Sequence, residues 1–317
     1  DNIQDLRIQD IQPGNIYPYF PEMNLIPHLS PICNSESKGE ETLKILNARN
    51  INEDSIKIFE IGFSINKYDD LLNIIRDQKY SAESLKKSGL FIEHEKGYMD
   101  RFRNRMIFPI YSHLNKVIGF AGRIIDDQKQ AKYVNSPETP IYNKRRVLYG
   151  LHLNKNDIIN QKSAIVVEGY FDLIQLYQAN IKNVIAVSGT AFTDEHALAI
   201  SKLCKIIYIA YDGDNAGKEA AIRAGYTILK NNLNVKIINI PNKLDPDDWI
   251  QAQGAEPFKE AYQNAEDLLN FHYKNQKQDV QTDHGKIEFI NTVLLELNDI
   301  ENELTVESLS KQLSEIT

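Results

Sequence analysis

The sequence predicts an α/β protein (α+β overall) with a parallel sheet in its second half. Runs of β-branched and aromatic residues alternate with helical patterns from 158 to 240, which is typical of a parallel α/β sheet. Several runs are continuously apolar, as strands buried on both faces are. Two of them end abruptly in carboxylates and glycine, at 168–169 and 212–214. Helical periodicity fills 256–317, so we expect a C-terminal helical bundle.

Length and composition narrow the class of protein. The chain has 317 residues, is 42% hydrophobic and 25% charged, and carries a net charge of −8, which fits a soluble globular protein of two or three domains. We find no apolar run long enough to span a membrane and no signal-peptide pattern. Cys33 and Cys204 lie far apart without metal-binding partners, so we expect neither a zinc site nor a disulfide framework. This use of cysteine favours a cytoplasmic location. Because the chain begins with Asp1, we expect a fragment or a processed product.

One segment of this acidic protein is strongly basic. Residues 101–150 contain ten Lys or Arg and three Asp or Glu, a local charge of +7, so the remainder carries −15. Such a block indicates an anionic partner.

The first half divides into an arm and a basic subdomain. Residues 1–38 contain five of the eleven prolines, so we expect an irregular arm. We assign 39–157 to a mixed α/β basic subdomain, with helical patterns from 39 to about 78, a strand or sharp turn at 61–63 and a short helix at 81–89. Strands 106–111 and 117–125 are expected to form a hairpin in which Gly119 and Gly122 let another backbone or a ligand approach closely. Prolines should keep 132–146 out of regular structure, with its polar groups facing a ligand.

The second half divides into a sheet domain, 158–253, and a helical bundle, 254–317. We predict strands at 164–168, 184–188, 206–211 and 235–240, and helices at 171–178, 193–203 and 216–230. The loop at 243–249 should open a further short helix, and polar breaks at 276–279 and near Asn302 should divide the bundle.

The carboxylates at the strand ends suggest a metal site. Open parallel sheets bind ligands beyond the carboxyl ends of their strands, so Glu168, Asp212 and Asp214 should converge. Converging carboxylates repel one another unless a cation lies between them, and oxygen ligands suit Mg²⁺ or Mn²⁺. The alternative is that Asp-Gly-Asp is only an exposed turn and helix cap, and these residues alone leave both interpretations open.

The second half of the chain carries an ordered set of motifs: Glu-Gly-Tyr-Phe-Asp at 168–172, Ser-Gly-Thr at 188–190, the Asp-Gly-Asp segment 211–217 and Leu-Asp-Pro-Asp-Asp at 244–248. Further motifs lie upstream, at 101–110, 117–123, 132–139 and 149–151. From about residue 40 to 317 this set resembles the catalytic core of bacterial DnaG-type primases, with the first four motifs in its Toprim portion and the others in the segments that precede Toprim. Asn50 departs from the pattern, which usually has glycine there, and 1–38 match nothing familiar. The zinc ribbon that precedes this core in the family is not found in the chain, nor is a Walker motif.

The resemblance implies an RNA polymerase that makes short primers on single-stranded DNA from NTPs. It implies that Asp212, Asp214, Asp245 and Asp247 hold Mg²⁺ or Mn²⁺, with two or more ions, and that Glu168 binds metal or acts as general base. Asp-Pro-Asp at 245–247 is also an ordinary helix start. A replicative helicase and a single-strand-binding protein are the implied partners, with the helicase-binding domain outside this chain. The implied residues for nucleotide and template are Arg49, Arg123, Lys132, Asn135, Ser136, Lys144 and Tyr170.

Several residues allow more than one role. Tyr170 could position Glu168, stack on a base or simply pack. The arginines at 101, 103 and 105 are expected to share a solvated face, His196 to lie at the surface, and Trp249 to lie in the core.

Two alternatives to a primase remain open. Another Toprim enzyme, such as a metal-dependent nuclease, would share the carboxylates, whereas a topoisomerase needs a tyrosine nucleophile in further domains. A non-catalytic module that binds single-stranded DNA has no reason to keep a costly anionic cluster.

Overall fold

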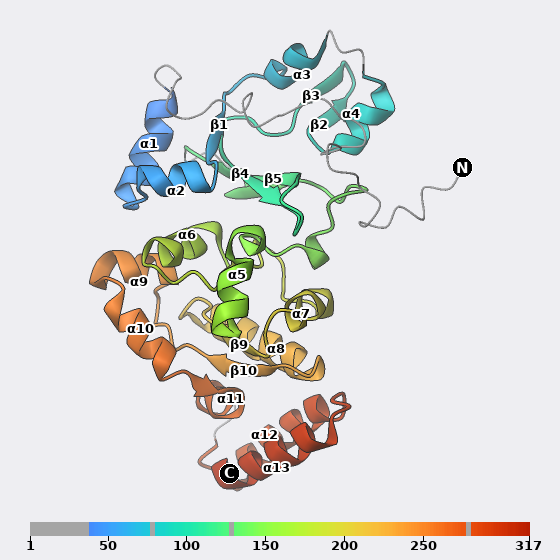
Figure 1. The fold of residues 1–317 in the computed structure, drawn as a ribbon. Helices are drawn as coiled ribbons and strands as arrows, with labels where there is room; N and C mark the ends of the chain where they lie inside the picture. The colour runs from blue at the N-terminus through green and yellow to red at the C-terminus, as the bar shows by residue number, and fades with distance from the viewer. Residues whose placement is uncertain (1–37, 77–79, 127–129, 277–279) are drawn as a thin grey trace. The chain divides into compact units, whose positions relative to one another are not determined.

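The computed structural model describes residues 38–76, 80–126, 130–276 and 280–317 and divides the chain into two compact units, up to Lys144 and from Arg145 (Figure 1). The expected arm at 1–38 falls almost entirely outside the described residues. The unit boundary lies before the expected one at 157, so the helix at 151–161 belongs to the second unit. No helix of the described ranges has the length and apolar character to cross a bilayer.

The described residues of the first unit form four short α-helices and two small sheets. These helices are α1 (Lys38–Ala48), α2 (Glu53–Ile58), α3 (Asp70–Ile75) and α4 (Ala82–Ser88). A short 3₁₀ helix, η4 (Lys144–Arg146), crosses the boundary between the two units. One sheet has the order β1-β4-β5-β6, formed by Gly62–Ser64, Arg105–Tyr111, Val117–Ile124 and Tyr133–Asn135. The other is the hairpin of β2 (Phe91–His94) and β3 (Gly97–Asp100). Ser81 caps α4 and the helix ends next to Gly89, as predicted, and Gly89 adopts the left-handed conformation.

Two expectations for this unit are wrong. The segment at 132–146 is not wholly irregular, because β6 pairs antiparallel with β5 and precedes both of its prolines. Arg105 does not lie on a solvated face: it is 4% exposed and donates to the carbonyls of Gly122 and Ala131 at 3.0 and 3.1 Å. A Cβ at Gly122 would lie 2.8 Å from Arg105 Cδ, so this glycine makes room for the arginine side chain rather than for a ligand.

The second unit is built on the predicted sheet, whose order is β11-β10-β9-β7-β8. Strands β7 (Ser163–Val167), β8 (Val184–Ala186), β9 (Ile206–Ile209) and β10 (Asn234–Ile237) are parallel, as expected. The short edge strand β11 (Glu266–Asp267) pairs antiparallel with β10 and was not predicted. The connecting helices are α5 (Leu151–Gln161), α6 (Tyr170–Gln178), α7 (Asp194–Ser201) and α8 (Asn215–Lys230), followed by α9 (Pro246–Gln253) and α10 (Glu256–Gln263).

Both faces of this sheet are covered. Ala164 and Val166 of β7 share one apolar cluster with residues of α5, α7 and α8. On the other face, Tyr208 of β9 packs edge-on against Tyr262 of α10, with ring centroids 4.5 Å apart. Trp249 of α9 is buried against Phe258 of α10, which confirms the predicted core position. Helices therefore cover both faces of the sheet, and loops follow the carboxyl ends of its parallel strands.

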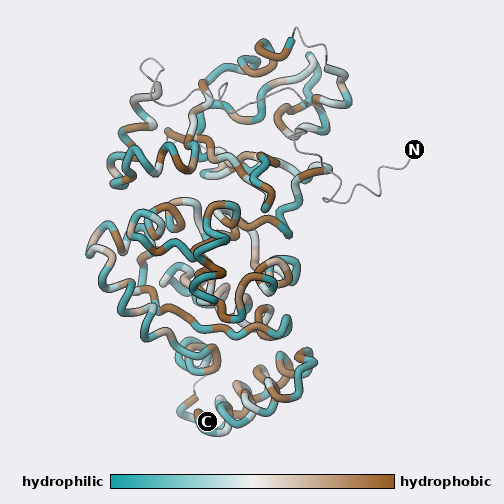
Figure 2. Tube along the Cα trace, in the orientation of Figure 1, coloured by the Kyte–Doolittle hydropathy of each residue, from teal (hydrophilic) through white to brown (hydrophobic). Residues whose placement is uncertain are grey.

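The C-terminal helices continue the same core instead of forming a separate domain at 254–317. They are α11 (Leu268–Asn275), α12 (Asp283–Leu297) and α13 (Glu303–Ile316), and apolar stretches recur along the last two (Figure 2). Phe289, Val293 and Leu309 belong to the cluster that includes the sheet residues. Asn302 is the N-cap of α13, which confirms the break predicted near this residue.

His196 corrects another prediction. It is fully buried at the start of α7 instead of lying at the surface. Its ring Nδ1 accepts a hydrogen bond from the main-chain N–H of Thr193 at 3.3 Å, and the main-chain N–H of His196 donates to Thr193 Oγ1 at 3.1 Å. His196 is therefore part of a helix cap.

Candidate active site

Glu168 and Asp212 meet because their strands are neighbours in the sheet. β7 and β9 run parallel with Val166 opposite Ile209, and Ala210 N donates to Val166 O at 2.9 Å. Both strands therefore end at the same edge, and Asp212 N donates to Glu168 Oε1 at 3.3 Å.

Gly213 brings the loop before α9 against this edge. Its N–H donates to Leu244 O at 2.8 Å, and a Cβ at this position would lie 2.1 Å from Pro241 O. Only glycine allows this approach, which carries Asp245 towards the Asp212 turn.

Asp214 and Asp245 are helix N-caps as well as candidate ligands. Asp214 Oδ1 accepts from Gly217 N at 2.8 Å, and Asp245 Oδ1 accepts from Asp248 N at 2.6 Å. The simple turn-and-cap interpretation is therefore true of both residues. It does not exclude a metal role, since each of these cap hydrogen bonds engages one oxygen of its carboxylate.

Asp172 is a site residue that sequence reasoning missed. It lies in the first turn of α6, where Oδ2 accepts from Gly169 N at 2.8 Å and Oδ1 accepts from Asp247 N at 3.4 Å. Its buried carboxylate thus joins the loop after β7 to the start of α9. The sequence signal that could have identified Asp172 is its place in the 168–172 motif, four residues after Glu168.

The site holds more negative charge than its protein neighbours neutralise. Burial raises the pKa of Glu168, and the carboxylates of Asp214 and Asp245 raise it further, although the Asp212 N–H opposes them. Burial raises the pKa of Asp172 well above its ordinary value, as do the charges of Asp245, Asp212 and Asp247. A bound cation would relieve both effects.

The available donors fit a hard divalent cation. Carboxylate oxygens of Asp245, Asp247 and Asp248 lie within 4.8 Å of one another, and Glu168, Asp212 and Asp214 add further oxygens at the same edge. All-oxygen sets of this kind suit Mg²⁺ or Mn²⁺. Asp248 was not among the predicted ligands, and it is exposed.

The predicted nucleotide and template residues lie mainly in the first unit. Arg123 on β5 pairs with Tyr133 on β6, and Ile124 N donates to Lys132 O at 3.0 Å. Arg123 and Asn135 therefore lie on the same face of this sheet, and Lys132 directly precedes β6. Arg49 follows α1, and Lys144 begins η4. Asn50 adopts a left-handed φ of 54°, which explains how asparagine can stand where the resembling family has glycine.

Two of the predicted ligand contacts are contradicted by burial. Ser136 is 1% exposed, and its Oγ accepts from Phe120 N at 2.9 Å, so it fastens the end of β6 to β5. Tyr170 is 2% exposed and packs edge-on against Tyr149 at 4.7 Å between ring centroids. Neither side chain presents a surface to a nucleotide.

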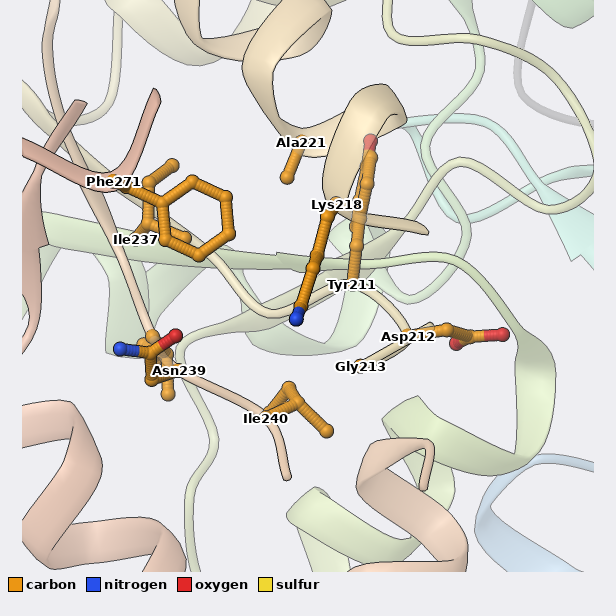
Figure 3. Close-up of a pocket in the computed structure, with 10 residues that line it drawn as sticks. Tyr211, Asp212, Gly213, Lys218, Ala221, Ile237, Asn239, Ile240 and Phe271 are labelled. Atoms are coloured by element: carbon orange, nitrogen blue, oxygen red, sulfur yellow. The ribbon is translucent and has the colours of Figure 1, made fainter. Parts of the chain in front are cut away.

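A small pocket lies behind the Asp212 turn (Figure 3). It lies between the start of α8, the end of β10 and α11. The Lys218 side chain extends into it, whereas the Asp212 carboxylate points away from it (Figure 3). The Asp212 carboxylate is therefore turned away from the pocket, although the residue belongs to its lining.

Curated relatives resemble most of the chain. A DNA primase of Listeria monocytogenes is 35% identical over 283 residues, which cover 88% of this chain and 45% of the relative. A DNA primase of Geobacillus stearothermophilus is 34% identical over 281 residues, covering 88% of this chain and 47% of the relative. The chain thus spans just under half the length of these relatives.

Solved structures resemble the whole fold. A DNA primase domain from Pseudomonas aeruginosa superposes with a TM-score of 0.83 and 30% identity, covering 92% of this chain and 96% of that one. A DnaG primase catalytic domain bound to ssDNA gives a TM-score of 0.79 and 29% identity, with the same coverage.

Two family models match successive parts of the chain. Residues 33–155 match the N-terminal domain of the DNA primase catalytic core, and residues 165–250 match a Toprim-like domain. Fold and site thus define the class, an α/β protein whose Toprim-like sheet carries an acidic cluster suited to metal binding. The chain belongs to the bacterial DnaG-type DNA primases and corresponds to their catalytic core.

Proposed function

We propose that the chain synthesises short RNA primers on single-stranded DNA by metal-dependent nucleotidyl transfer. The observation that carries this proposal is the convergence of carboxylates from three separate loops at the carboxyl edge of one parallel sheet. The sequence and structural relatives support it, since they are DNA primases and one of them is bound to ssDNA.

The reaction joins two ribonucleotides. A 3′-hydroxyl attacks the α-phosphate of an NTP, a new phosphodiester bond forms, and pyrophosphate leaves. Two or more bound Mg²⁺ or Mn²⁺ ions would stabilise the attacking oxygen, the leaving group and the triphosphate charge. Asp212, Asp214, Asp245 and Asp247 are the residues that would hold them.

Glu168 has a role of its own in the proposal. Its carboxyl is half-buried and its pKa is raised by burial and by two neighbouring carboxylates. It would bind metal or accept the proton of the attacking hydroxyl, because a raised pKa suits proton transfer near neutral pH. The Asp212 N–H fixes the carboxylate in place.

Binding of template and nucleotide is assigned to the basic surface of the first unit. Arg49, Arg123, Lys132, Asn135 and Lys144 supply charges and an amide of the kind that contact phosphate and sugar. A replicative helicase and a single-strand-binding protein are proposed partners, in the bacterial cytoplasm. The helicase would bind through a domain outside this chain.

The decisive experiment is a primer-synthesis assay on single-stranded DNA with labelled NTPs and Mg²⁺ or Mn²⁺. Labelled RNA of a few nucleotides is the expected product. Metal-dependent cleavage of the DNA without NTP incorporation would support a Toprim nuclease instead, and DNA binding without either reaction would indicate a binding module.

A further inference from the structure

Asp247 is the most deeply buried of the proposed metal ligands. It is 1% exposed, whereas Asp214 is exposed and Glu168, Asp212 and Asp245 are half-buried. A buried carboxylate is costly unless hydrogen bonds hold it. The groups that hold Asp247 therefore control where its oxygens point.

Gln251 holds the Asp247 side chain from within the same helix. Its Nε2 donates to Asp247 Oδ1 at 2.6 Å. The two residues lie four positions apart in α9, so they are neighbours on one face of the helix. The Asp247 main chain is held separately, because its N–H donates to Asp172 Oδ1 at 3.4 Å.

We propose that Gln251 is a positioning residue that fixes the Asp247 carboxylate for metal binding. This inference rests on the proposed function, since it assigns an outer partner to one ligand of that site. The amide engages Oδ1 and thereby orients the whole carboxylate. Because the amide is neutral, it leaves the full negative charge of Asp247 for the cation, which a lysine or arginine at this position would partly neutralise.

The same helix offers a matched control. Gln253 lies two residues further on, is exposed, and accepts from Trp249 Nε1 at 3.1 Å. Gln253 carries the same amide side chain on the same helix, but it contacts a core tryptophan instead of a site carboxylate. Gln251→Leu and Gln253→Leu therefore each remove one side-chain hydrogen bond from α9, and only the first removes it from Asp247.

The test measures Mn²⁺ binding to the full 317-residue chain, with free Mn²⁺ followed by electron paramagnetic resonance. Gln251→Leu should raise the Mn²⁺ dissociation constant roughly tenfold or more, because loss of an outer partner of a metal ligand typically has an effect of that size. Gln253→Leu should leave it within about twofold of the unsubstituted chain. Thermal unfolding in EDTA checks that both variants are folded. If Gln251→Leu does not fold, Gln251→Ala is measured in its place.

The outcomes separate this inference from the function on which it rests. If the unsubstituted chain binds Mn²⁺ and Gln251→Leu binds it equally well, or if Gln253→Leu weakens binding as much, the role of Gln251 is overturned and the metal site stands. If the unsubstituted chain binds no Mn²⁺, the proposed metal chemistry and the role of Gln251 both fall.

Discussion

Gly213 is the residue whose substitution should most directly disturb the site without removing a ligand. In Gly213→Ala the new Cβ would lie 2.1 Å from Pro241 O, so the loop carrying Asp245 must move away. We expect primer synthesis to fall at least a hundredfold, since small misplacements of catalytic groups cost that much. Mn²⁺ binding should weaken in parallel.

Gly254→Ala is the matched control for this substitution. Gly254 ends α9 with φ 77°, and a Cβ there would meet nothing within 4 Å. It should cost about 1–3 kcal/mol of stability through its backbone conformation alone, because φ 77° with ψ −178° is a region that residues other than glycine rarely adopt, and it should leave activity nearly unchanged. Equal activity of the two variants at saturating metal would contradict the role assigned to Gly213.

The sequence predicts the carboxylates at strand ends because strand order and chain direction place them together. It does not predict Asp172, whose importance depends on a contact with Asp247, 75 residues away in the chain. It also cannot show that Ser136 and Tyr170 are buried, because hydroxyl groups occur both in sites and in well-bonded cores. The chemistry of a residue is visible in the sequence, whereas its accessibility is a property of the fold.

At the scale of elements, the stability that α12 contributes should come from the residues on its buried face. Phe289 is fully buried and packs edge-on against Tyr273 at 5.2 Å, whereas Ile287 on the same helix is 56% exposed. Phe289→Ala should lower the free energy of unfolding by about 3–5 kcal/mol, and Ile287→Ala should change it by less than about 0.5 kcal/mol. Urea denaturation of the two variants would measure this, and a similar loss in both would contradict the shared core of α12 and the sheet.

The contact between α11 and α8 should make stability depend on pH. His272 Nδ1 lies 2.9 Å from the Tyr226 hydroxyl, and burial lowers the pKa of His272, although the Glu296 charge opposes this. Below the ordinary histidine pKa of 6.5, the unfolded chain binds a proton that the folded chain resists. His272 should therefore make the free energy of unfolding fall as the pH drops below that value, whereas buried carboxyls with a raised pKa, such as Asp100 and Asp172, act in the opposite direction.

His272→Gln should reduce this fall between about pH 7 and pH 5. Part of it should remain, because burial also lowers the pKa of His152 to about 4. His284→Gln, at a side chain 84% exposed on α12, should behave like the unsubstituted chain. A slope unaltered in His272→Gln would show that His272 does not contribute to it.

Elements with an apolar run or helical period of their own could be predicted, and two short strands without one could not. All four parallel strands and the helices between them follow from apolar runs and periodicity. The two-residue β11 and the three-residue β6 are strands only because β10 and β5 lie beside them, and such pairing leaves no local pattern. The bundle at 254–317 was predicted as a separate domain because periodicity reports a buried face but not the partner of that face.

At the scale of the whole molecule, the basic surface should bind template mainly through charge. Lys132→Ala and Lys144→Ala should each weaken single-stranded DNA binding at low salt. Each should also reduce the slope of log K against log[salt] by about 0.7, since a contact with a single-stranded phosphate releases that share of a counterion. Lys96→Ala, in the exposed turn between β2 and β3, is the control. Slopes equal to the control's would remove these lysines from the template site.

The most direct test of the central claim compares primer synthesis by the unsubstituted chain and by Asp212→Asn, on single-stranded DNA with NTPs and Mg²⁺ or Mn²⁺. Asparagine keeps the size of the side chain and the backbone N–H that donates to Glu168, but it removes one negative charge from the metal site. We predict short RNA products from the unsubstituted chain, a loss of at least a hundredfold in Asp212→Asn, and an unchanged melting temperature in EDTA. Primer synthesis by Asp212→Asn at a normal rate would contradict the carboxylate metal site.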